Sequence, residues 1–355
     1  MRVSWPVIDS WANSLLIAAG LDQDAASNVV ANLDYAERRG FSSHGYIRLP
    51  TYISRILAGG INRRPNITIV EDRAAVAVVD ADSAIGAHSA VRCVDITTNK
   101  ASTSGVGVVI ARSANHFGAA GHYTDLMASQ GFFGIAVCNT DKLMCAPFGG
   151  KPVLGSNPLS IAVPFPNGIG PQVDMATTEA SYGKILVARD KSQQIPLGWA
   201  VNAEGAPTTD PQEALDGALL PAGGPKGFGL AFMIDCLLAL GGAATSDEVA
   251  PLYGDPGTPQ QLGHAFIAIS AELVQSDSQY AQRIRDLSSA VHNSGTASAT
   301  RAPMVPGEPE TQFLNSTDTW DSSASTIGQL QLVSQELGVP LPDSIEASLR
   351  PVTED

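Results

Sequence analysis

The sequence predicts a mixed α/β protein of two domains, with a central α/β core and helical segments towards both chain ends. Three observations support this fold class: a length of 355 residues, helical periodicity near the N-terminus, and β-rich apolar runs alternating with helices from residue 67 onward. A single domain usually holds roughly 100–200 residues. We therefore expect two domains, with room for an interleaved third segment.

A helical hairpin opens the chain. Residues 7–19 and 24–39 each carry apolar side chains at three- and four-residue spacing, and a glycine follows each run as a stop signal. A polar turn, FSSHG, then leads into a third predicted helix, which the glycines at positions 59 and 60 end. The first 60 residues are thus expected to be helical.

From residue 67 the helical rhythm gives way to strands and helices in alternation. Long connections rich in proline and glycine interrupt this alternation, so we do not expect a purely parallel, doubly wound sheet. A loop is expected over 294–326 and a polar tail at the end. The predicted elements are, in order, strands ITIVE and AAVAVVDAD, a helix over 88–103, strand GVGVVIARS, a helix over 119–130, strand GFFGIAVCN, a strand over 159–164, a buried helix over 227–241, a strand over 264–270 and a helix over 327–337.

Composition argues against two classes of partner. The formal charge of −14 opposes binding to nucleic acid or to an anionic membrane surface, since both need a basic footprint. Five of the six lysines nevertheless fall between residues 142 and 226, which indicates either an anionic ligand there or scattered solvated side chains. We see no apolar run of the roughly 20 residues that span a bilayer, no signal peptide and no CxxC spacing. A cytoplasmic protein is expected.

The strongest local pattern is NHFGAAGHYTDL, residues 115–126. Its histidine, His116, follows an apolar strand and precedes a helix flanked by glycines, which is where open α/β sheets place their sites. An imidazole with a pKa near neutrality suits proton exchange with a carbonyl or hydroxyl oxygen. We therefore regard His116 as an acid/base candidate, against the alternative of a histidine that only caps the turn.

A second pattern, SSHGYIR, covers residues 42–48. It places His44 and Arg48 four residues apart at a helix entrance, so that an imidazole and a guanidinium can point at one place. Arginine can hold a carboxylate through two parallel hydrogen bonds, a geometry that lysine cannot reproduce. The alternative is an exposed helix end with Arg48 in a surface ion pair.

The third pattern is GGPKGFGL, residues 223–230, where glycines allow close approach and Lys226 adds charge at a helix N-terminus. It would suit a phosphate or pyrophosphate. No GxGxxG follows a predicted strand, so a Rossmann domain is not expected. Nor does the sequence contain a GxSxG elbow, an HExxH motif, a Walker loop or a Cys/His set for zinc, and we predict no metal site.

Several motifs in the same order resemble the malate/L-lactate dehydrogenase family that lies outside the Rossmann lactate dehydrogenases. This family includes ureidoglycolate and sulfolactate dehydrogenases and the diketogulonate and piperideine-2-carboxylate reductases. The similarity runs through most of the chain. The motifs are RGFSSHGYIRLPTY, GVGVVIARSANHFGAAGHY, PFGGKPVLGSNPLSIAVP, VDMATTEASYGKI, IPLGWAVNAEGAPTTDP, LLPAGGPKGFGLAFMID and VPGE.

The resemblance implies a homodimer and a non-Rossmann NAD(P)-binding domain with a largely antiparallel sheet, over residues 73–309. Residues 1–72 with 310–355 would form a helical substrate and dimerisation domain. His116 and His44 would share acid/base catalysis, and Arg48 with Ser43 would bind the substrate. The cofactor-binding residues implied are Asn139, Thr140, Val173, Asp174, Met175, Ala176, Thr177, Thr178, Pro225, Lys226, Gly307, Glu308 and Pro309.

The function implied by the resemblance is hydride transfer between NAD or NADP, with NAD slightly favoured, and a small 2-oxo or 2-hydroxy acid. The acid would be of the malate, lactate, sulfolactate or ureidoglycolate type. The alternative is reduction of a cyclic imine carboxylate, in which nitrogen is protonated instead of oxygen. Gly-Pro-Lys at residues 224–226 replaces the Gly-His-Lys of many members and is more similar to the ureidoglycolate branch.

Overall fold

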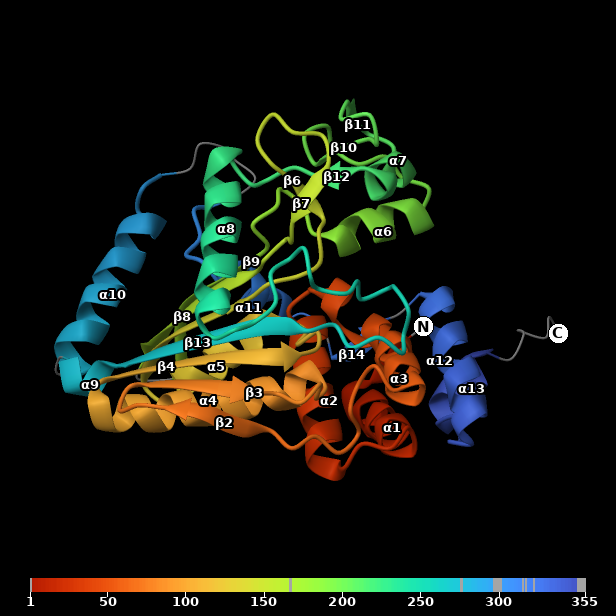
Figure 1. The fold of residues 1–355 in the computed structure, drawn as a ribbon, viewed down its shortest axis with the longest axis horizontal. Helices are drawn as coiled ribbons and strands as arrows, with labels where there is room; N and C mark the ends of the chain where they lie inside the picture. Colours follow the sequence, from red (N-terminus) through yellow and green to blue (C-terminus); the bar gives the residue numbers. More distant parts are fainter. Residues whose placement is uncertain are drawn as a thin grey trace.

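Helices from both chain ends share one hydrophobic core. The computed structural model describes residues 2–165, 168–274, 277–295, 302–314, 316, 318–321 and 323–349. Trp11 and Leu15 from the start of the chain pack in the same buried cluster as Trp320 and Leu330 from its end. Figure 1 shows the corresponding helices side by side. They are α1 (Trp5–Ala18), α2 (Gln23–Arg38), α3 (Leu49–Ala58), α12 (Ala324–Leu337) and α13 (Asp343–Leu349), with a small ladder of β1 (Arg2–Ser4) and β14 (Thr319–Asp321).

A large mixed sheet forms the centre of the molecule. Its order is β2-β3-β4-β13-β5-β8-β9, and only the β3–β4 pair is parallel. The sheet is therefore largely antiparallel, and the predicted mixed α/β fold without a Rossmann domain is confirmed. The strands are β2 (Thr68–Asp72), β3 (Val76–Asp80), β4 (Val106–Ala114), β5 (Phe132–Cys138), β8 (Leu159–Phe165), β9 (Gly168–Met175) and β13 (Leu262–Ser270).

Helices cover both faces of this sheet. Successive residues of a strand point to opposite faces, so Val109 of β4 packs with the cluster under α4 (Gly86–Ser104) and α5 (Ala120–Ser129). The next residue, Ile110, packs against Ile234 and Leu238 of α8 (Pro225–Leu240) on the other face. Figure 1 shows α8 above β13, whereas α4 and α5 overlap the strands β2, β3 and β4 in this view. This layering buries β4 and brings its carboxyl end to the middle of the molecule.

A second, smaller sheet lies apart from the large one, at the top of Figure 1. Its order is β11-β10-β12-β6-β7. Its strands are β6 (Met144–Cys145), β7 (Pro152–Leu154), β10 (Ala200–Val201), β11 (Pro207–Thr208) and β12 (Ala218–Leu219), with α6 (Tyr182–Asp190) and α7 (Pro211–Asp216) beside them. The remaining helices of the described chain are α9 (Ala271–Val274), α10 (Asp277–His292) and α11 (Glu308–Leu314).

Most elements expected from the sequence are present, with two corrections. We expected the helix over 227–241 to be buried because it is apolar on all sides. In the structure α8 buries one side against the sheet but exposes Leu230, Phe232, Met233 and Leu240. The expected loop over 294–326 contains α11 and β14, and its residues 296–301, 315, 317 and 322 lie outside the described residues, as does the tail after 349. Among the described helices, none is long and apolar enough to cross a membrane.

Candidate active site

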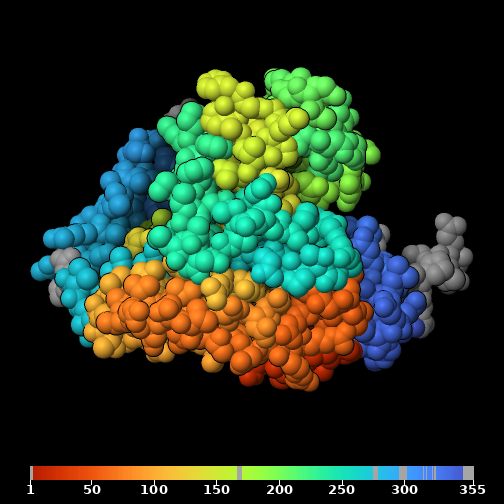
Figure 2. Space-filling model, viewed as in Figure 1, coloured from red at the N-terminus to blue at the C-terminus, as the bar shows by residue number. Residues whose placement is uncertain are grey.

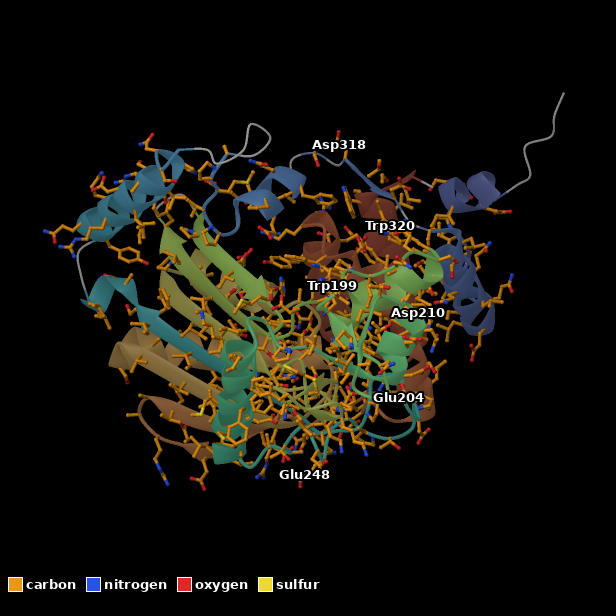
Figure 3. All side chains as sticks on the ribbon, turned by 90° about the horizontal axis from the view of Figure 1, so that it is seen from above. Trp199, Glu204, Asp210, Glu248, Asp318 and Trp320 are labelled. Atoms are coloured by element: carbon orange, nitrogen blue, oxygen red, sulfur yellow. The ribbon has the colours of Figure 1, made fainter. Side chains whose placement is uncertain are left out.

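The acid/base and carboxylate-binding residues predicted from the sequence meet at one cavity of about 970 Å³. Its walls come from the turn before α3, the β4–α5 loop, the end of β9, α6 and the loop between α8 and β13. Trp199, labelled in Figure 3, belongs to the wall nearest the small sheet. The predicted residues that line the cavity are Ser43, His44, Arg48, His116, Thr140, Asp174, Met175, Ala176 and Thr178.

His116 lies in the loop that follows β4, and its ring is held on one side. Its Nδ1 is 2.7 Å from the Tyr52 hydroxyl and accepts the Gly118 N–H at 3.2 Å. A backbone N–H can only donate, so Nδ1 carries the lone pair of the neutral ring and the proton lies on Nε2. His116 can therefore offer an N–H to an oxygen atom in the cavity.

The loop that carries His116 is fixed by a buried asparagine. Asn32 of α2 accepts the Ala119 N–H at 3.0 Å and donates to the Ala119 carbonyl at 3.1 Å, which satisfies both groups. Gly118 has φ +78, and a Cβ there would lie 1.8 Å from Asn32 Oδ1. Glycine is required at this position because the backbone is left-handed and the side chain of Asn32 occupies the space.

Two short 3₁₀ turns, Ser42–His44 and Tyr46–Arg48, carry the second predicted pattern to the same place. The rings of His44 and His116 stack with centroids 5.8 Å apart and an interplanar angle of 16°. Ser43 Oγ lies 3.0 Å from His44 Nδ1, so the hydroxyl can orient the ring. The two histidines proposed from separate motifs are thus neighbours.

Arg48 is buried at the edge of the cavity, with 5% of its surface exposed. Its Nε donates to the Ser43 carbonyl at 2.6 Å, and one Nη donates to the Tyr253 hydroxyl. Among the described residues no carboxylate forms an ion pair with Arg48. A buried cation without a counter-ion is costly, so the site favours an anionic ligand.

Burial disfavours the charged form of both histidines. Burial lowers the pKa of His44 to about 3, and the nearby charge of Arg48 contributes to this shift. Burial also lowers the pKa of His116 well below its ordinary value, with additional contributions from the charges of Arg48 and His44. Because Arg48 contributes in both cases, an anion bound to Arg48 would oppose this effect and raise both pKa values.

The residues implied as cofactor ligands fall into three groups. Thr140 and the segment Asp174–Thr178 lie at the main cavity, although Thr177 is buried and donates to the Ser156 carbonyl. Gly307 and Glu308 line a neighbouring cavity of about 450 Å³. This second cavity adjoins β9, because the Gln172 N–H donates to the Pro306 carbonyl at 3.0 Å.

The other implied cofactor residues lie away from both cavities. Asn139 is fully buried, and its amide bonds the Gly263 N–H and the Ala244 carbonyl. The side chain of Val173 lies on neither cavity wall, and its carbonyl accepts a hydrogen bond from Ser160. Pro225 and Lys226 begin α8, and Pro309 follows in α11.

Three residues for which the sequence predicts no role contact the predicted set. The Tyr52 hydroxyl is hydrogen-bonded to His116, and the Tyr253 hydroxyl to Arg48. Gln260 Oε1 accepts the backbone N–H of His116 at 3.0 Å. Tyr52 follows His44 and Arg48 at four-residue spacing, a signal that is also explained by the apolar face of the helix. Among the described residues no group of three or more His, Cys, Asp or Glu side chains could hold a metal ion.

Comparisons with known proteins find relatives along most of the chain. The family model for malate/L-lactate dehydrogenase matches residues 3–319. L-sulfolactate dehydrogenase of Methanocaldococcus jannaschii is 40% identical over 313 residues, which cover 88% of this chain and 90% of that protein. Ureidoglycolate dehydrogenase (NAD(+)) of Escherichia coli is 37% identical over 80% of this chain and 81% of its own length.

Solved structures show the same relationship. Sulfolactate dehydrogenase from Methanocaldococcus jannaschii superposes with a TM-score of 0.89 and 35% identity, covering 98% of this chain and 99% of that one. Malate dehydrogenase from Pyrococcus horikoshii superposes with a TM-score of 0.88 and 28% identity, covering 96% and 97%. The resemblance seen in the sequence motifs is therefore confirmed, and the chain belongs to the malate/L-lactate dehydrogenase family.

Proposed function

We propose that this protein is a nicotinamide-dependent dehydrogenase that interconverts a small 2-hydroxy acid and its 2-oxo acid. One observation carries the proposal: Arg48 is buried without a carboxylate partner among the described residues, in the cavity that also holds the stacked pair His44 and His116. This reaction needs a cation that binds the carboxylate of the acid and, beside it, a group that transfers a proton to or from the neighbouring oxygen. The relatives described above are dehydrogenases by name.

In the reductive direction, each residue has a separate task. Arg48 binds the carboxylate next to the reacting carbon and so orients the 2-oxo group towards the histidines. The neutral ring of His116 donates a hydrogen bond from Nε2 to the oxygen that gains negative charge, while Tyr52 and Gly118 hold the opposite side of the ring. The proton that this oxygen finally receives is one that the histidine pair first takes up from solvent once the carboxylate is bound. His44 stacks on that ring, and the carboxylate bound at Arg48 raises the pKa of both histidines so that a proton is available.

The cavities fit a dinucleotide as well as a substrate. A volume of about 970 Å³ is at the upper end of ordinary ligand pockets and exceeds what a small acid fills. Burial, with a smaller contribution from the charge of Glu310, raises the pKa of Asp174 on the main cavity wall to about 6. Glu310 of α11 lines neither cavity, but its buried Oε2 has no hydrogen-bond partner among the described residues. Carboxyl oxygens can accept hydrogen bonds from ribose hydroxyls. A bound nicotinamide supplies or accepts the hydride.

We assign the cofactor to those residues implied by the family that line the two cavities, with Thr140, Asp174, Met175, Ala176 and Thr178 in the main cavity and Gly307 and Glu308 in the smaller one. NAD is the preferred form in this proposal. Two relatives differ in the cofactor that their names specify, NAD(+) in one and NADP(+) in the other, and the one named for NAD(+) is the more similar to this chain.

The test is turnover. Purified protein is mixed with NADH or NADPH and, separately, pyruvate, oxaloacetate, sulfopyruvate or piperideine-2-carboxylate, and the nicotinamide absorbance is followed; ureidoglycolate is tested with NAD and NADP. We expect oxidation of NADH by at least one 2-oxo acid. Arg48→Gln should greatly slow this turnover at a fixed, low substrate concentration, because KM rises, whereas Arg64→Gln, on the exposed surface, should keep it. Turnover of the imine alone would identify the alternative reductase, and no turnover at all would refute the proposal.

We also propose that the protein is a cytoplasmic homodimer, with the helical and cofactor domains divided at residues 72 and 310. Supporting dimerisation, α8 exposes Leu230, Phe232 and Met233, and it packs beside the β6–β7 hairpin on one face of the molecule (Figure 2). Contiguous apolar surface of this kind usually marks an interface. Light scattering after size-exclusion chromatography tests the assembly, and a monomer at assay concentration would contradict it.

The cytoplasmic location is supported by the free cysteines, of which three are buried and which fit a reducing compartment. Cell fractionation tests that location.

A further inference from the structure

One loop connects the two halves of the site. It runs from α8 to β13, and we call its residues 249–261 the crossing loop. Pro251, Leu252, Tyr253, Gly254 and Gln260 of this loop line the main cavity. They belong to no sequence motif described above, and the family resemblance assigns none of them a role.

The crossing loop is held in place by a buried arginine of α3. Arg55 has 1% of its surface exposed and donates to the carbonyl oxygens of Leu252, Asp255 and Thr258. The backbones also approach closely, since a Cβ on Gly60 would lie 2.2 Å from the Pro256 carbonyl oxygen. Three hydrogen bonds from one planar guanidinium define the path of the loop, so its side chains have fixed positions in the cavity wall.

The same loop reaches the proton-transfer histidine at its other end. The side-chain oxygen of Gln260 accepts the backbone N–H of His116 at 3.0 Å, and the backbone N–H of Gln260 donates to Asn115 Oδ1 at 3.3 Å. The positions of the crossing loop and of His116 are therefore coupled. A side chain that the loop presents to Arg48 is positioned relative to the reacting centre and not only relative to the surface.

Tyr253 is that side chain. Its hydroxyl accepts a hydrogen bond from Arg48 Nη1, and the Arg48 Cζ lies 5.4 Å from the centre of its ring. A guanidinium only donates, so the phenol keeps its own proton for another acceptor. No acceptor for this proton is present among the described residues, and the side chain lines the cavity. Tyr182 packs against the ring with centroids 6.3 Å apart.

The hydrogen bonds of Arg48 explain why a second donor is needed. Its Nε is already used by the Ser43 carbonyl, so the fork formed by Nε and Nη2, which usually binds a carboxylate, is not available. The free donors that remain on this side are the outer Nη protons and the phenol proton of Tyr253. Together they can still bind both oxygens of one carboxylate.

We propose that Tyr253 is a substrate-binding residue, whose phenol donates a hydrogen bond to the carboxylate that Arg48 holds. The inference rests on the proposed function, because it assumes that the ligand of Arg48 is the carboxylate of a 2-oxo acid. It adds a determinant that the N-terminal motif does not contain. Substrate recognition would then require one residue from the start of the chain and one from the crossing loop.

The test uses oxamate, an unreactive 2-oxo acid mimic, titrated by calorimetry into the full-length protein with and without NADH. Tyr253→Phe keeps the ring and removes only the hydroxyl; Tyr280→Phe on α10, outside the main cavity, is the matched control. Loss of a hydrogen bond to a charged group should weaken oxamate binding about tenfold or more. The control should bind like wild type, and KM should rise more than kcat falls.

A double variant tests whether Tyr253 and Arg48 bind the same carboxylate or whether Tyr253 affects oxamate binding indirectly. If Tyr253 and Arg48 bind the same group, Tyr253→Phe should weaken oxamate binding much less in an Arg48→Gln background than in wild type. Equal effects in both backgrounds would overturn the proposal, as would wild-type affinity in the single variant with its circular dichroism unchanged. Wild-type protein that neither binds oxamate nor turns over any 2-oxo acid would instead refute the proposed function itself.

Discussion

Replacement of Arg48 by lysine separates the charge of this residue from its geometry. The guanidinium is 5% exposed and has three separate tasks: a hydrogen bond to the Ser43 carbonyl, a second to Tyr253, and the proposed bond to the substrate. A lysine ammonium keeps the positive charge but is a single point on a flexible stem, and it cannot donate to the Ser43 carbonyl, Tyr253 and the substrate in the fixed directions of a planar guanidinium. The change should therefore affect binding geometry without removing the cation.

The expected size of the effect follows from the hydrogen bonds that lysine cannot form. A hydrogen bond to a charged group contributes about 1.5–3 kcal/mol, and every 1.4 kcal/mol is about tenfold in affinity. If lysine forms one fewer hydrogen bond to the carboxylate, KM should rise about 10- to 100-fold. Arg48→Gln, which also removes the charge, should raise KM further.

The pH dependence of kcat distinguishes the two variants. The charge of Arg48 lowers the pKa of His44 and of His116, so Arg48→Lys should leave the profile in place and Arg48→Gln should move it to higher pH. Steady-state rates provide the measurement, from about pH 3, the pKa of His44 in the free site, to about pH 8, the upper end of the range in which an ordinary histidine titrates. A kinetically silent Arg48→Lys variant would show that this residue does not bind the carboxylate.

Other variants and ligands probe the histidines and the loop that carries His116. His116→Ala should lower kcat by about 10²–10⁴-fold, and an unchanged kcat would move the proton-transfer role to His44. Oxamate binding should be accompanied by proton uptake, because a carboxylate at Arg48 raises histidine pKa values that are low in the free site. The affinity for oxamate should therefore fall as pH rises. Calorimetry in two buffers of different ionisation enthalpy measures the proton uptake, and no uptake would contradict this prediction. Asn32→Ala leaves the N–H and C=O of Ala119 unpaired, at about 1–3 kcal/mol each; thermal unfolding should show a lower Tm and kcat should fall, whereas a wild-type Tm would contradict the role of Asn32.

The parts of the fold that the sequence predicts are those with long periodic patterns. The strand GVGVVIARS and the helices that end at glycines are recognisable because burial on one face repeats over several turns or residues. The small sheet is not predictable in this way, because its strands of two or three residues are too short to show alternation. The exposure of α8 escapes prediction for a different reason: an apolar helix is the same in sequence whether a protein core or another surface covers it.

The site residues, like the elements of the fold, include some that the sequence predicts and some that it does not. His44 and Arg48 lie in one short motif, and His116 follows a strand, so local position is sufficient to select them. Tyr253 has no such signal, because its place beside Arg48 depends on Arg55, which lies far away in the chain and bonds the backbone of the crossing loop. Hydrogen bonds to backbone carbonyls leave no residue pattern in the loop they hold.

The electrostatics of the free site connect binding with proton transfer. A buried guanidinium without a carboxylate partner among the described residues raises the free energy of the site, and its charge helps to keep the adjacent imidazoles neutral. An anion relieves both effects at once: it pairs with Arg48 and makes protonation of the histidines more favourable. A substrate without a carboxylate would neither pair with Arg48 nor raise the pKa of the histidines. The cation would stay unpaired, and the histidines would remain harder to protonate. Selection for a 2-oxo acid would then act on the chemical step as well as on affinity.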